Sequence, residues 1–409
     1  MTKRRTRSGK TSNTQRAIVS GISGAIIIII VLIAQFVAGI DVLPNEQENA
    51  NNPPVIDTGG SGGPSGAIVQ IPGGIDGGWF QAYFTQPSGT TNFSGAPVED
   101  ALVKALDGAQ QTIDAALYEL NSQPITDALI RAYQRNVRVR IVTDGEFGLD
   151  APDTTVDQLE LAGIDVQSDG SRNAYMHDKF VVIDSQFVWT GSTNLTHQGI
   201  YRQNNNAILI RSSQLAQNFT TEFEELFAGQ FGKTSPRTVP NPVVTVNGTQ
   251  IETIFESEGD AASRLAALFN QAQSVRFLAF SFTDSLEWTD QAGNHSVMDL
   301  LRDRAVSGQL DLKGIVEATT RRFIAPLFCA GLDVRQDGNT FGFLHDKVFI
   351  IDQSIVVTGS FNFSSSADDD NDENMLIIHN PDMALAYLRE FDQRWAEAEQ
   401  IPASEISCN

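Results

Sequence analysis

"YMHDKFVVIDSQFVWTGSTN" (Tyr175–Asn194) and "FLHDKVFIIDQSIVVTGSFN" (Phe343–Asn362) are two versions of one pattern within a single chain. The match continues upstream, because residues 162–194 and 330–362 align without a gap at an offset of 168, with 16 identities in 33 positions. The best matched positions are polar. If the two copies served only to form a stable core, apolar positions would be expected to match best. The repeat therefore indicates a duplicated fold whose two motifs act in one site.

The residues upstream of each motif repeat more loosely and predict the fold class. Each half is expected to begin with a strand, an amphipathic helix and a second strand, at residues 111–120, 124–136 and 137–145, and at residues 274–282, 296–308 and 310–318. This order, followed by a hairpin, predicts an α/β fold with a mostly parallel sheet covered by helices. We place the two halves at residues 77–237 and 238–409, with a Pro-rich connector at 232–242.

Three segments precede the first half. Residues 1–16 carry six Lys and Arg and no acidic residue, and residues 17–40 form an uncharged run of 24. At 1.5 Å per residue this run is long enough to cross a hydrocarbon core of about 30 Å as a single transmembrane helix. The basic tail favours a cytoplasmic N-terminus and an extracytoplasmic body, with a cleaved signal peptide as the alternative. Residues 41–76 are rich in Gly, Pro and Asn and are expected to be a flexible linker.

The charge and the cysteines limit the classes of partner. The net charge is -22, so the chain beyond the basic tail carries -28, which disfavours a broad duplex nucleic acid surface but leaves room for a local basic pocket. Cys329 and Cys408 are too few for a disulfide scaffold and wrongly spaced for zinc. Two separate thiols are the favoured interpretation, and one disulfide is the alternative if this part is exported. No protein partner is indicated.

The motifs carry the residues for phosphodiester chemistry. His177 and Lys179 stand at i and i+2 of a predicted strand, so their side chains project from the same face, and His345 and Lys347 repeat this arrangement. A turn and a second strand bring the following Gly-Ser-x-Asn back to the level of the histidine. Two ammonium groups can hold a phosphate while one imidazole attacks phosphorus and the other protonates the leaving oxygen. The lysines would replace a metal as charge stabilisers, so no metal or other cofactor is expected.

Asp184 and Asp352 complete the two motifs and belong to the candidate catalytic set. Strand alternation, however, turns them away from the His and Lys side chains, and both begin a predicted turn. A structural role, as a turn former or a buried ion partner, is therefore favoured over direct chemistry.

H-x-K-x-x-x-x-D followed by G-S-x-N, present twice, resembles the phospholipase D superfamily, and the similarity covers nearly all of residues 77–409. The resemblance implies two similar α/β/α halves with mixed, mostly parallel sheets, packed about a pseudo-two-fold axis with both motifs in one cleft. It also implies a phosphohistidine intermediate formed without a metal. The candidate substrate-binding residues are Ser192, Asn194, Ser360, Asn362 and Glu373.

By this resemblance His177 is the nucleophile and His345 is the general acid, which later activates water; the sequence alone does not separate them, because both motifs read H-D-K. Family members often have an acid after the second motif strand that orients the opposite or the neighbouring histidine. Glu373 fills this place in the second half, whereas the first half offers Asn205. A neutral amide cannot stabilise an imidazolium as a carboxylate does, so the two histidines are expected to be inequivalent.

The implied activity is that of a phosphoric diester hydrolase of phospholipase D type, which cleaves membrane phospholipid to phosphatidic acid and the free head group. The alternatives are an exported, metal-independent nuclease of the same superfamily, a phosphatidyltransferase, and a non-catalytic binding module, which the intact motifs disfavour. The expected membrane anchor favours lipid and the acidic body disfavours nucleic acid. Neither observation decides between these substrates.

Overall fold

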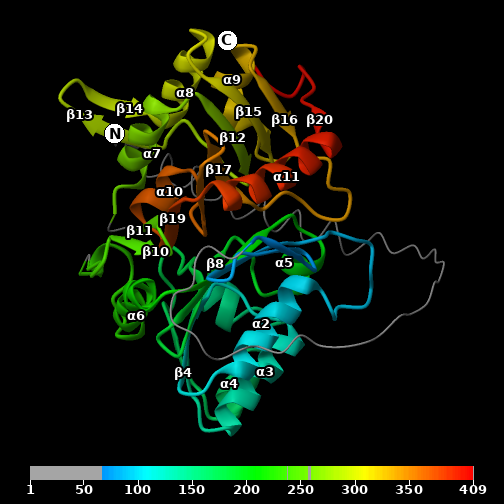
Figure 1. Cartoon of the computed structure of the whole chain (residues 1–409), viewed down its shortest axis with the longest axis vertical. Coiled ribbons are helices and arrows are strands. Elements are labelled where there is room, and N and C mark those ends of the chain that lie inside the picture. The colour runs from blue at the N-terminus through cyan, green and yellow to red at the C-terminus, as the bar shows by residue number, and fades with distance from the viewer. Residues whose placement is uncertain (1–66, 237, 257–258, 409) are drawn as a thin grey trace, which may run out of the picture. The chain divides into compact units, whose positions relative to one another are not determined.

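The computed structural model describes residues 67–236, 238–256 and 259–408 (Figure 1). The expected basic tail, the expected transmembrane helix and most of the expected linker lie outside the described residues. Within the described residues, no helix is both long and apolar enough to cross a membrane.

Two nine-stranded sheets form the framework of the described residues. The first has the order β1-β2-β3-β9-β8-β7-β4-β5-β6, and the second has the order β10-β11-β19-β18-β17-β12-β15-β16-β20. The strands of the first sheet are β1 (Val69–Ile71), β2 (Gly74–Asp76), β3 (Phe80–Phe84), β4 (Thr112–Leu117), β5 (Arg138–Thr143), β6 (Asp165–Ser168), β7 (Lys179–Ile183), β8 (Phe187–Gly191) and β9 (Asn206–Arg211). Those of the second are β10 (Val243–Val246), β11 (Thr249–Glu256), β12 (Ser274–Ala279), β15 (Asp311–Val316), β16 (Asp333–Gln336), β17 (Lys347–Ile351), β18 (Ile355–Gly359), β19 (Glu373–His379) and β20 (Glu399–Gln400). The run from β3 to β6 therefore matches the run from β11 to β16 strand by strand.

The α/β class agrees with the sequence, but the expectation of mostly parallel sheets is wrong. In each sheet six of the eight strand pairings are antiparallel, and only β4-β5-β6 and β12-β15-β16 run parallel. Parallel neighbours need a long crossover, which the helices between these strands provide. Tight turns join the two strands of each motif hairpin, β7 to β8 and β17 to β18, which gives antiparallel pairs. Longer segments, residues 192–205 and 360–372, then lead to the antiparallel strands β9 and β19.

Helices cover both sheets. The first half contains α2 (Pro97–Gly108), α3 (Gln123–Gln134), α4 (Val156–Leu161), α5 (His197–Tyr201), α6 (Ser213–Phe227), η2 (Gly145–Leu149) and η3 (Gly232–Thr234). The second half contains α7 (Ala261–Gln271), α8 (Val297–Val306), α9 (Ala325–Cys329), α10 (Ser365–Asp369), α11 (Pro381–Glu397), η4 (Arg321–Ile324) and the small β13 (Glu287–Asp290) and β14 (Gly293–Ser296) ribbon. Helices α2, α3 and α4 pack together in one half, and α7, α8 and α9 do so in the other (Figure 1).

The first crossover shows how the sequence sets these helices. Ser122 caps α3 by accepting a hydrogen bond from the Ile125 N–H, and a proline follows in the first turn. Ile125, Ala128, Leu129 and Ala132 are buried at helical spacing, so one apolar stripe of α3 packs onto the sheet. This packing holds β4 and β5 side by side. The residues that follow β4 then lie next to the first motif.

The two halves share a core, and strand alternation decides which side chains enter it. Phe180 and Val182 of β7 face a central cluster that also includes residues of the second sheet, α6 and α11. Val181 and Ile183 face the opposite way, into the cluster beneath α2 and α3. Strand β17 alternates in the same manner between the central cluster and its own outer cluster. The halves are therefore packed as one body, which fixes one motif hairpin against the other.

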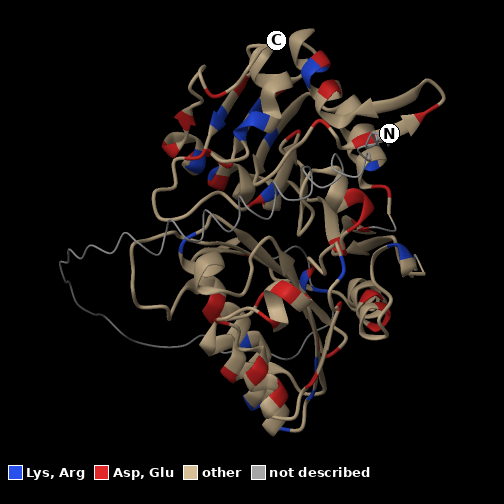
Figure 2. Cartoon of the chain, turned by 180° about the vertical axis from the view of Figure 1, so that it is seen from behind, with Lys and Arg blue, Asp and Glu red and all other residues tan. Residues whose placement is uncertain are grey.

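Acidic residues are spread over both halves, with Lys and Arg interspersed among them (Figure 2).

The edge of the first sheet reaches into the segment that was expected to be a linker. The folded part begins earlier than the boundary expected at residue 77, because β1 pairs with β2 and β2 pairs with β3 at the edge of the first sheet. Residues 69–76 are thus part of the first half and not of a flexible linker.

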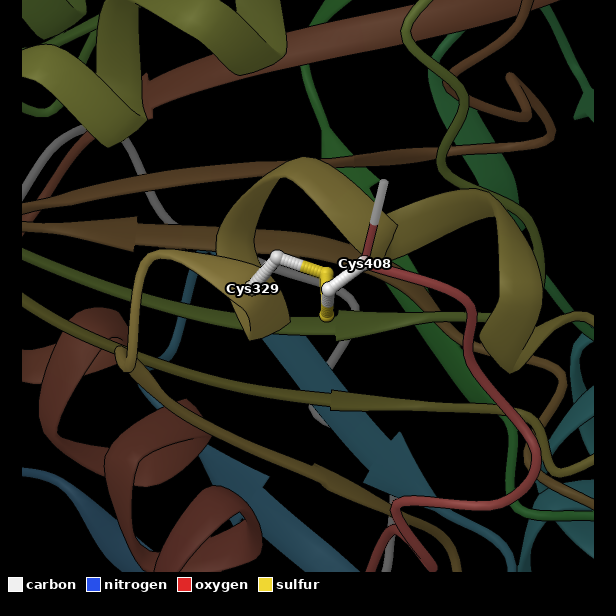
Figure 3. The surroundings of a disulfide bond; sticks show 2 residues. All are labelled: Cys329 and Cys408. Carbon is white, nitrogen blue, oxygen red and sulfur yellow. A yellow bond between two sulfur atoms is a disulfide. The ribbon is translucent and has the colours of Figure 1, made fainter.

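Cys329 and Cys408 form a disulfide (Figure 3), with their Cα atoms 5.5 Å apart. The favoured interpretation of two separate thiols is wrong, and the alternative is what the structure shows. The bond joins the end of α9 to the C-terminal segment, whose Ile401 and Ile406 are buried in the outer cluster of the second half. A separation of 79 residues gives no local signal of this pairing in the sequence.

Candidate active site

The two motifs meet where the halves join. The His177 N–H donates to the Asp372 carbonyl at 3.0 Å, and the Asp372 N–H donates to the carbonyl of Tyr175 at 2.9 Å. The equivalent contacts, each shifted by 168 residues, join His345 to Asn204 at 2.9 Å and Asn204 to Phe343 at 3.1 Å. This repetition of contacts is what a pseudo-two-fold axis between the motifs requires.

Both histidine–lysine pairs are buried and act on each other. His177 and His345 are only 7% and 6% exposed, and the lysines are equally enclosed. Lys179 Nζ donates to the His177 carbonyl at 2.6 Å, and Lys347 Nζ donates to the His345 carbonyl at 2.7 Å. Burial lowers the pKa of Lys179 to about 8 and lowers the pKa of Lys347 well below its usual value. Each lysine also lowers the pKa of the histidine in the other half, so the four side chains form a single electrostatic site.

Glu373 is positioned by the second half but serves the histidine of the first. Its Oε2 lies 2.7 Å from His177 Nδ1. Burial raises the pKa of Glu373 to about 8, against the influence of Lys179. Burial and both lysines lower the pKa of His177. Both shifts favour the uncharged forms, a neutral imidazole beside a neutral carboxyl group, over an ion pair.

Asn205 takes the corresponding position at the other histidine. Its Oδ1 lies 2.9 Å from His345 Nδ1, and its Nδ2 donates to the Gly199 carbonyl at 2.9 Å. Because Nδ2 is already used in this way, Oδ1 faces the ring and His345 must donate through Nδ1. Glu373 and Asn205, which differ between the two halves in the sequence, therefore both contact the Nδ1 atom of a histidine. In each case the histidine belongs to the opposite half.

A second layer of cross-half contacts holds the strands beneath the histidines. Asn374 Nδ2 donates to Asp178 Oδ1 at 2.6 Å, and Asn206 Nδ2 donates to Asp346 Oδ1 at 2.7 Å. Sequence reasoning missed these residues as part of the site. The signal was present, because Asn206 and Asn374 are identical residues at the same offset of 168 as the motifs.

The two motif serines support the neighbouring residues. Ser192 Oγ donates to Asn205 Oδ1 at 2.8 Å. Ser360 Oγ accepts from the Asn374 N–H at 2.9 Å and also hydrogen-bonds the Glu373 side chain. Both serines are fully buried, so they act on the groups that orient the histidines.

The two motif asparagines leave polar atoms available. Asn194 Nδ2 donates to Glu119 Oε2 at 2.9 Å, while Asn194 Oδ1 has no hydrogen-bond partner among the described residues. Asn362 Oδ1, at the matched position, also has no partner in the described part of the chain. A buried polar atom in this condition is costly unless a ligand or water satisfies it, so both asparagines are suited to contact a substrate.

Asp184 and Asp352 lie at the turn end of their hairpins, away from the histidine–lysine cluster. Asp184 accepts hydrogen bonds from the backbone N–H groups of Gln110, Gln111 and Thr112. Asp352 accepts equivalent bonds from the backbone N–H groups of Gln273 and Ser274, at the start of β12. Both have a positive φ, of 53° and 49°, which an Asp in a tight turn tolerates. The structure thus places these two aspartates apart from the histidines and lysines.

The fold and the paired histidine–lysine sets define a protein with two phospholipase D-like domains. The family described as "Cardiolipin synthase, PLD-like domain" matches residues 102–227 and 265–395, which is more than half of the chain. The chain therefore belongs to the phospholipase D superfamily, as the motifs predict.

Individual relatives match part of the chain. A mitochondrial cardiolipin hydrolase of Xenopus laevis is 33% identical over 126 residues, which are 31% of this chain and 59% of that protein. A phospholipase D of Rickettsia typhi is 35% identical over 136 residues, 33% of this chain and 62% of that protein. The chain thus spans about three fifths of each. The phosphatidylserine synthase structure of Haemophilus influenzae Rd KW20 has a TM-score of 0.59 and 13% identity, covering 78% of this chain and 89% of that one, which shows the shared fold.

Proposed function

We propose that this protein is a phosphodiesterase of phospholipase D type, which hydrolyses membrane phospholipid to phosphatidic acid and a free head group. One observation carries the proposal: two buried imidazoles, each oriented from the opposite half, share one site with two buried lysines. This arrangement supplies a nucleophile, an acid and two positive charges for one phosphate.

Glu373 favours His177 as the nucleophile. When Glu373 is ionised, His177 donates its Nδ1 proton to the carboxylate, so the Nε2 lone pair is free to attack phosphorus, and the carboxylate stabilises the imidazolium that forms. The P–N bond forms as the bond to the leaving oxygen breaks, and His345 Nε2 gives its proton to that oxygen. His345 then accepts a proton from water, whose oxygen attacks phosphorus and breaks the P–N bond. This second step regenerates both imidazoles.

His345 must carry a proton when it acts as the acid. Burial and the lysines lower its pKa in the free enzyme. A bound phosphodiester anion offsets the charges of Lys179 and Lys347 and so favours the protonated imidazole. The lysines would thus place the acid in its working state only when substrate is present.

The choice of lipid as substrate is supported by features outside the catalytic groups. The relatives include proteins named cardiolipin hydrolase and phospholipase D. We also propose that residues 17–40 anchor the chain in the cell membrane with the catalytic body outside, where lipid is at hand. The Cys329–Cys408 disulfide supports an oxidising, extracytoplasmic location.

The test offers the full chain four substrates in excess EDTA: phosphatidylcholine vesicles, cardiolipin vesicles, single-stranded DNA and duplex DNA. We expect phosphatidic acid or its cardiolipin equivalent, and phosphatidylethanol as well when ethanol is added, because an alcohol can replace water at the phosphohistidine. Cleavage of DNA with intact vesicles would replace this proposal with the nuclease. Alcohol products without any hydrolysis would favour a phosphatidyltransferase.

The phosphohistidine can be sought directly. The His345→Ala variant lacks the group that activates water, so it should accumulate an acid-labile, base-stable adduct on His177 that mass spectrometry detects after a brief incubation. Hydrolysis by the wild type with neither adduct nor alcohol product would indicate direct attack by water.

A further inference from the structure

Glu119 distinguishes the first half of the site from the second. It lies two residues beyond Leu117, which pairs with Lys179 across the sheet. Two residues beyond the partner of Lys347, the corresponding position is occupied by Ser281. The catalytic scheme above makes no use of this carboxyl group, although it lies beside one of the two lysines.

Glu119 contacts the asparagine of the first motif. Asn194 Nδ2 donates to Glu119 Oε2 at 2.9 Å, and Asn194 is 7% exposed. The other end of the amide, Oδ1, is buried without a partner among the described residues. Glu119, Asn194 and Lys179 line the same small cavity. One end of the amide is therefore held by the carboxyl group, and the other end is buried with no protein group among the described residues to hold it.

The protonation state of Glu119 decides which end of the Asn194 amide, Nδ2 or Oδ1, faces the ligand. An ionised carboxylate only accepts hydrogen bonds, so Asn194 must turn Nδ2 toward it. A protonated carboxyl group can donate to Asn194 Oδ1, which lets the amide turn its NH₂ group toward a ligand. Phosphate oxygens only accept from such groups, so the second orientation suits a phosphodiester and the first presents it with a carbonyl oxygen.

The surroundings of Glu119 allow both states near neutral pH. Burial raises its pKa to about 7, and the charges of Asp153 and Asp144 act in the same direction. The charge of Lys179 and the hydrogen bond from Asn194 lower it. These are the groups that face Glu119 from β7, from the end of β5 and from the loops after η2 and β8.

We propose that Glu119 is a positioning residue that sets the orientation of the Asn194 amide and, through it, the affinity of the site for the phosphodiester anion. Binding of the anion then takes up a proton at Glu119. The inference rests on the proposed function only for the identity of the anion, because any phosphate-like anion in the site would be affected in the same way.

The test measures binding of sulfate, which keeps its double charge across the range, to the full chain by calorimetry at pH 6, 7 and 8. Wild-type affinity should fall several-fold between pH 6 and pH 8, and one linked proton allows at most about tenfold per pH unit. Glu119→Gln has an amide that can donate or accept, so its affinity should fall less with pH than that of the wild type and should be higher than the wild-type affinity at pH 8. The dependence that remains reports the other groups of the site, such as Lys179, whose pKa is about 8. Glu146→Gln removes an equal charge from an exposed position of the same half and should keep the wild-type dependence.

Asn194→Ala separates positioning from simple charge repulsion. If Glu119 acts through the amide, Glu119→Gln should change sulfate affinity less than twofold in the Asn194→Ala background. An undiminished effect there would mean that the carboxylate repels the anion directly, and the proposal would be wrong. It would also be wrong if Glu119→Gln kept the wild-type slope.

The kinetic counterpart uses turnover of whichever phosphodiester the enzyme cleaves. KM should rise more steeply with pH in the wild type than in Glu119→Gln, while the pH profile of kcat should be the same in both, because the effect lies in binding. Sulfate binding that follows the expected pattern while vesicles remain intact would refute the lipid assignment and leave this inference standing.

Discussion

Replacing Glu373 with Gln should remove most of the nucleophilic activity of His177, although the two side chains have nearly the same shape. Asn371 Nδ2 donates to Glu373 Oε1 at 3.3 Å, whereas Oε2 faces His177 Nδ1 at 2.7 Å. In the variant, the Gln oxygen should take the place of Oε1, because an NH₂ group there would face another donor. Its own NH₂ group then points at Nδ1.

That orientation forces the wrong tautomer on His177. Nδ1 must accept a hydrogen bond, so the proton moves to Nε2, the atom that should attack phosphorus. In a serine protease, the equivalent loss of tautomer control costs about 10⁴-fold in kcat. We expect a loss of roughly 10³–10⁴-fold here, which is about 4–5 kcal/mol of transition-state stabilisation.

The assay is hydrolysis of bis(p-nitrophenyl) phosphate, a chromogenic diester that does not depend on the lipid assignment. Asn205→Asp is the matched control, since it exchanges amide and acid in the opposite direction at His345 and leaves a group that accepts from Nδ1. It should lose less than tenfold. If Glu373→Gln keeps more than a tenth of wild-type kcat with an unchanged melting temperature, the tautomer argument fails.

Four further results are expected. His177→Ala and His345→Ala should each abolish turnover, and the double variant should be hardly worse, because they act as one unit; half of the activity in each would mean two separate sites. Excess EDTA should leave turnover unchanged, because the two lysines carry the charge that a metal would supply; loss restored by zinc or calcium would contradict this. Cys329→Ser should lower the free energy of unfolding by about 2–4 kcal/mol, since the disulfide closes a loop of 79 residues, and an unchanged denaturation midpoint would argue against the bond. The free energy of unfolding should fall as pH rises from about 5 to 9, because burial raises the pKa of Glu256 from 4.5 to about 9 and the folded protein keeps a proton that the unfolded chain has lost. Glu256→Gln should reduce this slope by up to about 1.4 kcal/mol per pH unit. A slope equal to that of the wild type would exclude Glu256 as a source of the pH dependence.

The sequence contained most of the site because strand geometry is local. Side chains at i and i+2 share a face, which correctly placed His177 with Lys179 and turned Asp184 elsewhere. Because the motif residues are identical in two copies that align without a gap, we inferred that both histidine–lysine pairs work together. These inferences needed only the pattern and the period of two residues.

The relations that the sequence could not supply are those between distant segments. Nothing local indicates that Glu373 lies against the histidine of the other half, or that Asn194 is held by Glu119. The direction of the strands was also misjudged, because alternation of strands and helices suggests parallel pairing while the hairpins and later strands add antiparallel pairs. From the sequence alone the disulfide was only an alternative, because its cysteines are brought together only by the fold.

The crossed pairing of histidines and their partners has a meaning for how such a chain could evolve. If two identical copies of one half assembled as a symmetric dimer, both histidines would face the same residue, because one gene would encode both positions. Joining the copies in one polypeptide removes that constraint, and Glu373 and Asn205 can then differ. Covalent fusion thus permits a division of labour between two formerly equivalent groups, in which each half specialises by changing a residue that serves the other.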